Sequence, residues 1–245
     1  MFMSRKVLMI NGSFRKARTY NLLVQIVQIL KNHDIESEII NLFDYDIKHC
    51  KGCDDICIKH DACIVKDDMS ALMQKIMEAD GLVLSSPVYI NGVTSQFKAF
   101  ADRTNQWFHK PAPAGKPVLL VTTTAATGVK ETIHFLEHFS TGFGARKGGS
   151  ITRTNKTINT PAGEKELARF ISLLEKDRKN YSPGMNEIVI FNVQKVLALK
   201  STGKDRQFWE EKNWIPLRYY YDCKMNPAKK AFSKMMFGIL TGALK

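Results

Sequence analysis

The sequence has little that would direct the chain out of the cell or into a membrane. The apolar run at residues 7–10 is too short for the core of a signal peptide. No apolar run in the 245 residues is long enough to span a bilayer. Hydrophobic residues make up 44% of the chain, an ordinary share for a globular protein with a buried core. We therefore expect a soluble, cytoplasmic protein.

The sequence also lacks the motifs of several common protein classes. The loop after the first apolar run contains neither Gly-x-x-x-x-Gly-Lys-Ser/Thr nor Gly-x-Gly-x-x-Gly, the signatures of nucleoside-triphosphate and dinucleotide binding. No Ser/His/Asp or paired-carboxylate arrangement stands out as an acid–base or nucleophilic centre. Internal repeats and low-complexity tracts are missing as well, which argues against a repeat architecture.

Cysteines are scarce outside one short segment. Four of the five lie between Cys50 and Cys63, and Cys223 stands alone. In a reducing compartment, such a cluster indicates metal binding, redox chemistry or reduced thiols rather than disulfides.

Basic residues outnumber acidic ones, 36 Lys and Arg against 24 Asp and Glu. The formal net charge is +12, and residues 176–245 carry 14 Lys and Arg against 6 Asp and Glu, a net +8. A basic surface of this kind attracts phosphates, anionic cofactors, nucleic acid or acidic lipid, and its sign alone does not choose among them.

Apolar, β-rich runs alternate with segments of helical periodicity up to about residue 180. The predicted strands are residues 7–10, 36–42, 81–84, 118–121 and 149–152, and the predicted helices include 19–31, 95–107, 131–143 and 164–176. This order predicts an α/β fold with a parallel sheet covered on both faces. Ligands bind such sheets outside the carboxyl ends of the strands, so we expect a site in the loops after Ile10, Leu84 and Val121. Residues 1–180 then form one domain, and 181–245 form an extension.

The loop after the first strand has the composition of an anion-binding loop. Gly12 permits a tight turn, and the start of the following helix supplies unpaired backbone N–H groups and a positive dipole end. The forked guanidinium of Arg15 suits phosphate oxygens. Short hydrogen-bonding side chains accompany them at Ser13, Thr19 and Asn21. These residues predict a phosphate site, with an ordinary capped helix as the alternative.

Two motifs resemble one known family. Gly-Ser-x-Arg followed by Thr-x-Asn, and then Ser-Pro-x-Tyr at residues 86–89 before a helix that ends in Asp102-Arg103, resemble the NADPH-dependent FMN reductase family of flavodoxin-like proteins. The resemblance implies a doubly wound five-stranded parallel sheet of order 2-1-3-4-5, non-covalently bound FMN, and NAD(P)H as electron donor. It places one edge of the flavin ring on a loop of six residues, Pro87, Val88, Tyr89, Ile90, Asn91 and Gly92. It places the other side of the flavin near Thr123, Thr124 and Gly128.

The cysteine segment resembles the iron–sulfur flavoprotein branch of the same family. In that branch four cysteines hold a [4Fe–4S] cluster, which here implies Cys50, Cys53, Cys57 and Cys63 as ligands. The spacing departs from the branch, because three residues instead of two separate Cys53 from Cys57. Reduced thiols without a cluster and a zinc site therefore stay open as alternatives.

The extension is basic and aromatic, and it has no recognised nucleic-acid motif, so we expect no nucleic-acid partner. A stripe at helical spacing includes Phe232, Met235, Met236, Ile239 and Leu240. We expect this helical extension to dock on the core or across a homo-oligomer, rather than to lie on a membrane surface.

The leading hypothesis is an FMN-dependent oxidoreductase that passes electrons from NAD(P)H to a quinone, a flavin or another small-molecule or protein acceptor. The alternatives are an iron–sulfur electron carrier for a redox protein, and a non-enzymatic flavin-binding adaptor.

Overall fold

A five-stranded, all-parallel sheet forms the centre of the molecule, in the order β2-β1-β3-β4-β5. The computed structural model describes residues 5–53, 56–57, 63–201 and 203–243. The strands are β1 (Arg5–Asn11), β2 (Ile35–Asn41), β3 (Gly81–Pro87), β4 (Pro117–Thr123) and β5 (Arg146–Arg153). The predicted fold class and strand order are confirmed.

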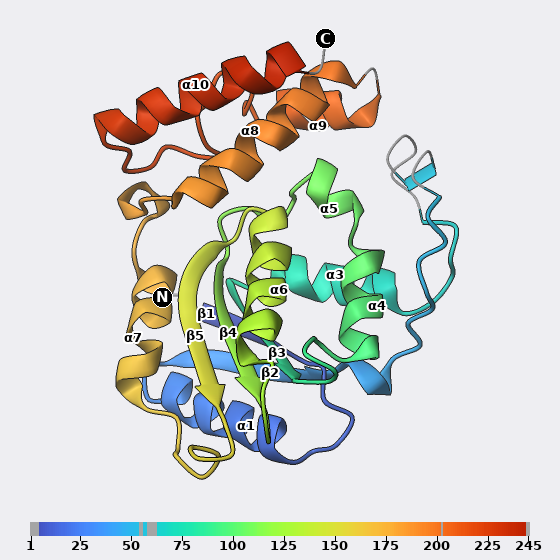
Figure 1. The fold of residues 1–245 in the computed structure, drawn as a ribbon, viewed down its shortest axis with the longest axis vertical. Helices are drawn as coiled ribbons and strands as arrows, with labels where there is room; N and C mark the ends of the chain where they lie inside the picture. Colours follow the sequence, from blue (N-terminus) through green and yellow to red (C-terminus); the bar gives the residue numbers. More distant parts are fainter. Residues whose placement is uncertain (1–4, 54–55, 58–62, 202, 244–245) are drawn as a thin grey trace.

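Alternate residues of the strands point to opposite faces of the sheet and build two separate cores. On one face, Leu8 and Leu120 pack with helices α3 (Met69–Glu78), α4 (Ser95–Arg103) and α6 (Val129–Gly142). On the other face, Met9 and Val121 pack with α1 (Arg18–Lys31) and α7 (Glu164–Glu175). Because both faces are covered (Figure 1), the inner strands β1 and β4 are buried at nearly every position, as in other parallel sheets.

One predicted helix is shorter than expected. The segment 95–107 is divided into α4 and a short helix, α5 (Gln106–His109). At the division, the backbone N–H and the hydroxyl of Thr104 both hydrogen-bond the carbonyl of Ala101, at 3.1 Å and 2.8 Å. A tight i→i+3 bond of this kind closes a helix. Helix α4 therefore ends at Arg103.

The extension is helical and has a core of its own. It contains α8 (Met185–Lys200), α9 (Lys204–Glu211) and α10 (Pro227–Ala243). Outside the extension, short 3-10 helices follow β2 at η1 (Leu42–Asp44) and α7 at η2 (Arg178–Asn180). Its aromatic residues pack on one another around Phe191 and Trp209, both 0% exposed. The extension lies beyond the end of the sheet opposite the arrowheads of β4 and β5 (Figure 1).

Hydrogen bonds attach the extension to the α/β part of the chain. Trp209 Nε1 donates to the carbonyl of His109 at 2.9 Å, and Gln194 Nε2 donates to that of Gly142 at 2.6 Å. The backbone N–H of Lys147 in β5 donates to the Tyr181 hydroxyl at 3.1 Å.

Across the described ranges, no helix combines the length and hydropathy needed to cross a bilayer.

Candidate functional site

A cavity of about 490 Å³ opens at the carboxyl edge of the sheet, where the loops after β1, β3 and β4 meet. The first loop contributes Ser13, Arg15, Ala17, Arg18 and Thr19, the second Pro87, Val88 and Tyr89, and the third Thr123, Thr124 and Ala125. The wall thus combines hydroxyl groups and two guanidinium groups with apolar surface. A flat, partly apolar molecule with an anionic end fits this donor set.

The first loop turns sharply and leaves its amides available. The Gly12 N–H donates to the Ser85 carbonyl at 2.8 Å, and a Cβ at Gly12 would lie only 3.0 Å from that same oxygen. The Ser13 hydroxyl donates to the Arg15 carbonyl at 2.9 Å, which closes the turn. Within the described part of the chain, the backbone N–H groups of residues 15–19 have no acceptor. These N–H groups stand at the positive end of α1, where anions bind readily.

The second loop is a rigid hairpin turn. The backbones of Tyr89 and Gly92 bond each other twice, at 2.8 Å and 3.0 Å. The two residues between them, Ile90 and Asn91, have positive φ angles of 47° and 56°. Two consecutive left-handed residues define a type I′ turn, which projects its tip into solvent. The loop is tied to β4 by the Val88 N–H, which donates to the Thr123 carbonyl at 3.0 Å.

The third loop packs against the other two. The hydroxyls of Thr123 and Thr19 lie 2.7 Å apart, so this contact joins the third loop to the start of α1. The Thr124 hydroxyl donates to the Thr127 carbonyl at 2.9 Å and tightens the turn before α6. Gly128, the N-cap residue of α6, has a φ of 86°.

The structure gathers most of the predicted flavin residues at this cavity and leaves five outside its wall. Eight of the thirteen line it: Ser13, Arg15, Thr19, Pro87, Val88, Tyr89, Thr123 and Thr124. Asn21 instead lines a neighbouring hollow beside Arg153, because it lies one turn further along α1. The other four belong to the hairpin or pack against it: Ile90, Asn91 and Gly92 form the hairpin, and Gly128 packs against it. Sequence reasoning missed Arg18, although it is a basic residue at the first position of α1.

We expect Gly128→Ala to weaken flavin binding and Gly92→Ala to leave it nearly unchanged. A Cβ at Gly128 would lie 2.6 Å from Val88 Cγ1 and 2.9 Å from Asn91 Cα, and its φ is unfavourable for alanine. The hairpin must move, at a cost of about 1–3 kcal/mol. At Gly92 the nearest atom is 3.8 Å away. Titration of FMN into each variant measures the difference, and equal affinities would show that the hairpin does not contact the flavin.

A second cavity, also about 490 Å³, contains the cysteine segment. Cys50, Cys53, Cys57 and Cys63 all line it, together with residues of α3 and the end of α4. The backbone N–H of Cys57 bonds the carbonyl of Cys53 at 3.3 Å, the i to i+4 pattern of a helical turn. This bond keeps Cys53 and Cys57 close to each other.

The donor set of this second cavity is four cysteine sulfurs, which suit a [4Fe–4S] cluster or a zinc ion. Four cysteine sulfurs are the usual ligands of a [4Fe–4S] cubane. Among the described residues, no three His, Cys, Asp or Glu side chains lie close enough to bind one metal ion. None of the five described cysteines forms a disulfide.

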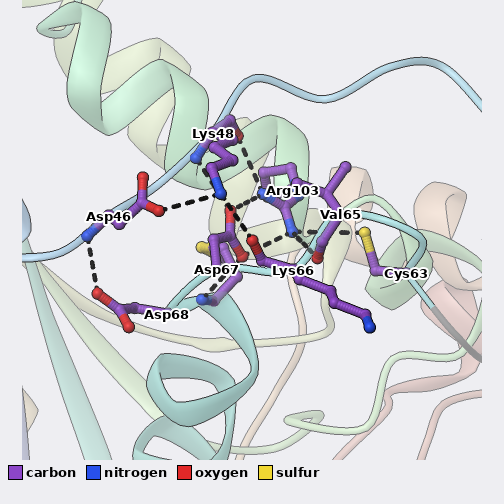
Figure 2. Close-up of polar contacts among 9 residues, drawn as sticks. Asp46, Lys48, Cys63, Val65, Lys66, Asp67, Asp68 and Arg103 are labelled. Atoms are coloured by element: carbon purple, nitrogen blue, oxygen red, sulfur yellow. Dashed lines mark hydrogen bonds and ion pairs between the residues drawn. The ribbon is translucent and has the colours of Figure 1, made fainter.

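Buried charges hold the base of the cysteine segment (Figure 2). Arg103 of α4 forms an ion pair with Asp67, and both side chains are almost fully buried. Burial of the Asp67 carboxyl raises its pKa, but the hydrogen bond and charge of Arg103, together with the backbone N–H groups of Lys48 and Met69, outweigh burial and lower the pKa of Asp67. Asp67 is therefore ionised at neutral pH, and the pair stays charged.

The fold and the first cavity define the class of this protein. A parallel sheet of order 2-1-3-4-5 with an anion-binding loop after β1 is the flavodoxin-like arrangement. The profile of one family, NADPH-dependent FMN reductase, matches residues 5–152, more than half of the chain. The chain belongs to this family.

Several curated relatives are iron–sulfur flavoproteins. One from Archaeoglobus fulgidus is 27% identical over 86% of this chain and 100% of its own length. A second from that organism is 46% identical over 40% of this chain and 48% of its own, and one from Methanocaldococcus jannaschii is 38% identical over 40% and 51%. The chain thus spans about half the length of two of these relatives and all of the third.

Two solved structures share the fold at low identity. RosB, with a bound 8-demethyl-8-formylriboflavin-5′-phosphate intermediate, matches with a TM-score of 0.53 at 16% identity, over 89% of this chain and 83% of its own. A flavone reductase matches with a TM-score of 0.53 at 17% identity, over 69% of this chain and 60% of its own.

Proposed function

We propose that this protein oxidises NAD(P)H through bound FMN and passes the electrons to a quinone, a flavin or another acceptor. The observation that carries the proposal is the cavity at the carboxyl edge of the sheet. Its unpaired amides, its hydroxyls and Arg15 form a binding site for one anion, and this site lies beside an apolar wall. The first loop suits a single terminal phosphate, which favours FMN over FAD.

Each loop has its own part in binding. Ser13, Arg15 and Thr19 hold the phosphate with the N–H groups at the start of α1. Tyr89 and Pro87 face the isoalloxazine edge, and the rigid hairpin keeps them in place before the cofactor arrives. FMN, when bound, accepts an electron pair and releases electrons singly, so it connects a nicotinamide to one-electron acceptors.

Half of Tyr89 is exposed, and Ile90 is fully exposed at the tip of the hairpin. A flavin held beside these residues would have an edge open to a second molecule. An open edge is what a bound donor or acceptor needs to reach the ring.

Absorption spectroscopy and a steady-state assay on the purified full-length chain test this function. We expect flavin bands, release of FMN and not FAD on denaturation, and NAD(P)H oxidation that requires an added quinone, flavin or ferricyanide. FMN binding without NAD(P)H oxidation under any of these acceptors would favour the adaptor alternative. No flavin affinity after reconstitution would contradict the proposal.

A second function is favoured by the second cavity. We propose that Cys50, Cys53, Cys57 and Cys63 hold a [4Fe–4S] cluster, which would supply one-electron transfer. The support is that all four line one cavity and that the Cys57 N–H bonds the Cys53 carbonyl, which keeps these two cysteines close. Iron and sulfide content of the same anaerobic preparation tests it. About four irons per chain is the expected value, and stoichiometric zinc, or no metal, would contradict it.

A further inference from the structure

Arg103 is a buried cation at the base of the cysteine loop, which we define as residues 48–67. It is the last residue of α4, and its side chain is 2% exposed. Asp67, its ion-pair partner, is 1% exposed. Removing two charges from water carries a large cost, and loss of one partner would leave the other charge buried and uncompensated.

The guanidinium group of Arg103 contacts both ends of the cysteine loop. At the first end, Nη1 donates to the carbonyl of Lys48 at 3.0 Å. At the second, Nη2 donates to the carbonyl of Val65 at 3.4 Å and to Asp67 Oδ1 at 3.0 Å. A planar group with five N–H donors in a fixed fork can hold two backbone segments together, whereas one ammonium group cannot reproduce this geometry.

The two ends of the loop also bond each other (Figure 2). The Lys48 N–H donates to Asp67 Oδ2 at 2.9 Å, and Lys48 Nζ donates to the Lys66 carbonyl at 2.9 Å. The Asp46 N–H donates to Asp68 Oδ2 at 2.8 Å, just outside the loop. The base is therefore closed, and Arg103 attaches this closed base to a core helix.

Arg103 also reaches one of the sulfurs. Its Nη2 lies 3.4 Å from Cys63 Sγ and donates to it, as Figure 2 shows. Arg103 lines the same cavity as the four cysteines, and its buried Nε has no partner among the described residues. Hydrogen bonds to cluster sulfurs raise the reduction potential of a cluster, and groups that orient the ligands strongly affect metal affinity.

We propose that Arg103 is the positioning residue of the cysteine loop. It fastens both ends of the loop to α4 and donates a hydrogen bond to Cys63, so that the four sulfurs surround one [4Fe–4S] cluster. The inference rests on the cluster proposed above. Arg103 itself is not a ligand.

The test compares wild type, Arg103→Lys and Asp67→Asn with a matched control, Arg153→Lys. Arg153 is another buried arginine that binds a carboxylate, Glu166 at 2.8 Å, and holds the loop after β5. In anaerobically purified full-length protein, we expect cluster affinity to fall about 10- to 100-fold in the Arg103 and Asp67 variants and to stay unchanged in the control. Any cluster that Arg103→Lys still holds should have a lower midpoint potential.

Hydrogen exchange separates the positioning role from the cluster itself. After treatment with a chelator, we expect backbone exchange of residues 46–69 to be faster in Arg103→Lys than in wild type, and unchanged in Arg153→Lys. Equal exchange would overturn the positioning role. If Arg103→Lys and wild type have the same iron content and the same midpoint potential, the proposal that Arg103 helps to hold the cluster is overturned. Wild type without iron, but with faster exchange in Arg103→Lys, would contradict the proposed cluster and leave the positioning role standing.

Discussion

The double variant Ser13→Ala, Arg15→Ala is expected to bind FMN about 30- to 1,000-fold more weakly than wild type. A charge-assisted hydrogen bond contributes about 1.5–3 kcal/mol and a neutral one about 0.5–1.5 kcal/mol, and each 1.4 kcal/mol changes affinity tenfold. Loss of the Ser13 hydroxyl also removes its bond to the Arg15 carbonyl, so the turn that aims the amides loosens. Quenching of flavin fluorescence on titration measures both dissociation constants.

Lys16→Ala is the matched control for this experiment. Lys16 lies in the same loop and carries the same charge as Arg15, but it does not line the cavity. We expect a small effect that disappears as salt is added, because an exposed charge acts only through the screened field. If the control and the double variant lose affinity equally, the phosphate is attracted by the overall positive charge of the loop and not by specific contacts with Ser13 and Arg15.

The second large effect is expected in the extension. Trp209→Ala should lower the free energy of unfolding by about 3–5 kcal/mol, because it removes a fully buried indole from an aromatic core. The ring of Trp209 lies 5.5 Å from that of Phe191 and 5.4 Å from that of Trp214. Its Nε1 bond to the His109 carbonyl is lost as well, so the α/β part of the chain should be destabilised together with the extension.

Thermal unfolding followed by circular dichroism measures this effect, with a decrease of about 10 °C or more in the midpoint. Met235→Ala is the control, because Met235 is 53% exposed on α10 and should change the midpoint little. If Trp209→Ala instead produced an early transition of the extension and an unchanged transition of the remainder, the extension would be an independent unit.

Much of the fold could be predicted because its signals are local. The periodicity of residues 19–31 and the apolar run of residues 118–121 each follow from their own neighbours in sequence, and the structure has α1 at Arg18–Lys31 and β4 at Pro117–Thr123. Helix α8 was not predicted, because it is apolar on most of its surface and therefore lacks a clear amphipathic period.

The candidate site also has features that can be predicted from the sequence and features that cannot. The chemistry of the first loop, with Gly12 at the turn and Arg15 after it, is readable from the sequence, because a strand end, a turn and a helix start are adjacent in the chain. Side-chain direction is not readable in this way. Asn21 lies on α1 beyond the reach of the cavity, and Gly128 acts through Val88 and Asn91, some forty positions away.

The sequence by itself determined the alternation of strands and helices, the anion-binding composition of the first loop and the clustering of the cysteines. Only the tertiary structure decided that Arg103 holds Lys48 and Asp67 together, and that Trp209 bonds His109 across 100 positions. The physical reason is that local patterns depend on neighbours in the chain. The partners of a buried charge or indole depend on which distant segments the packed sheet and helices bring side by side.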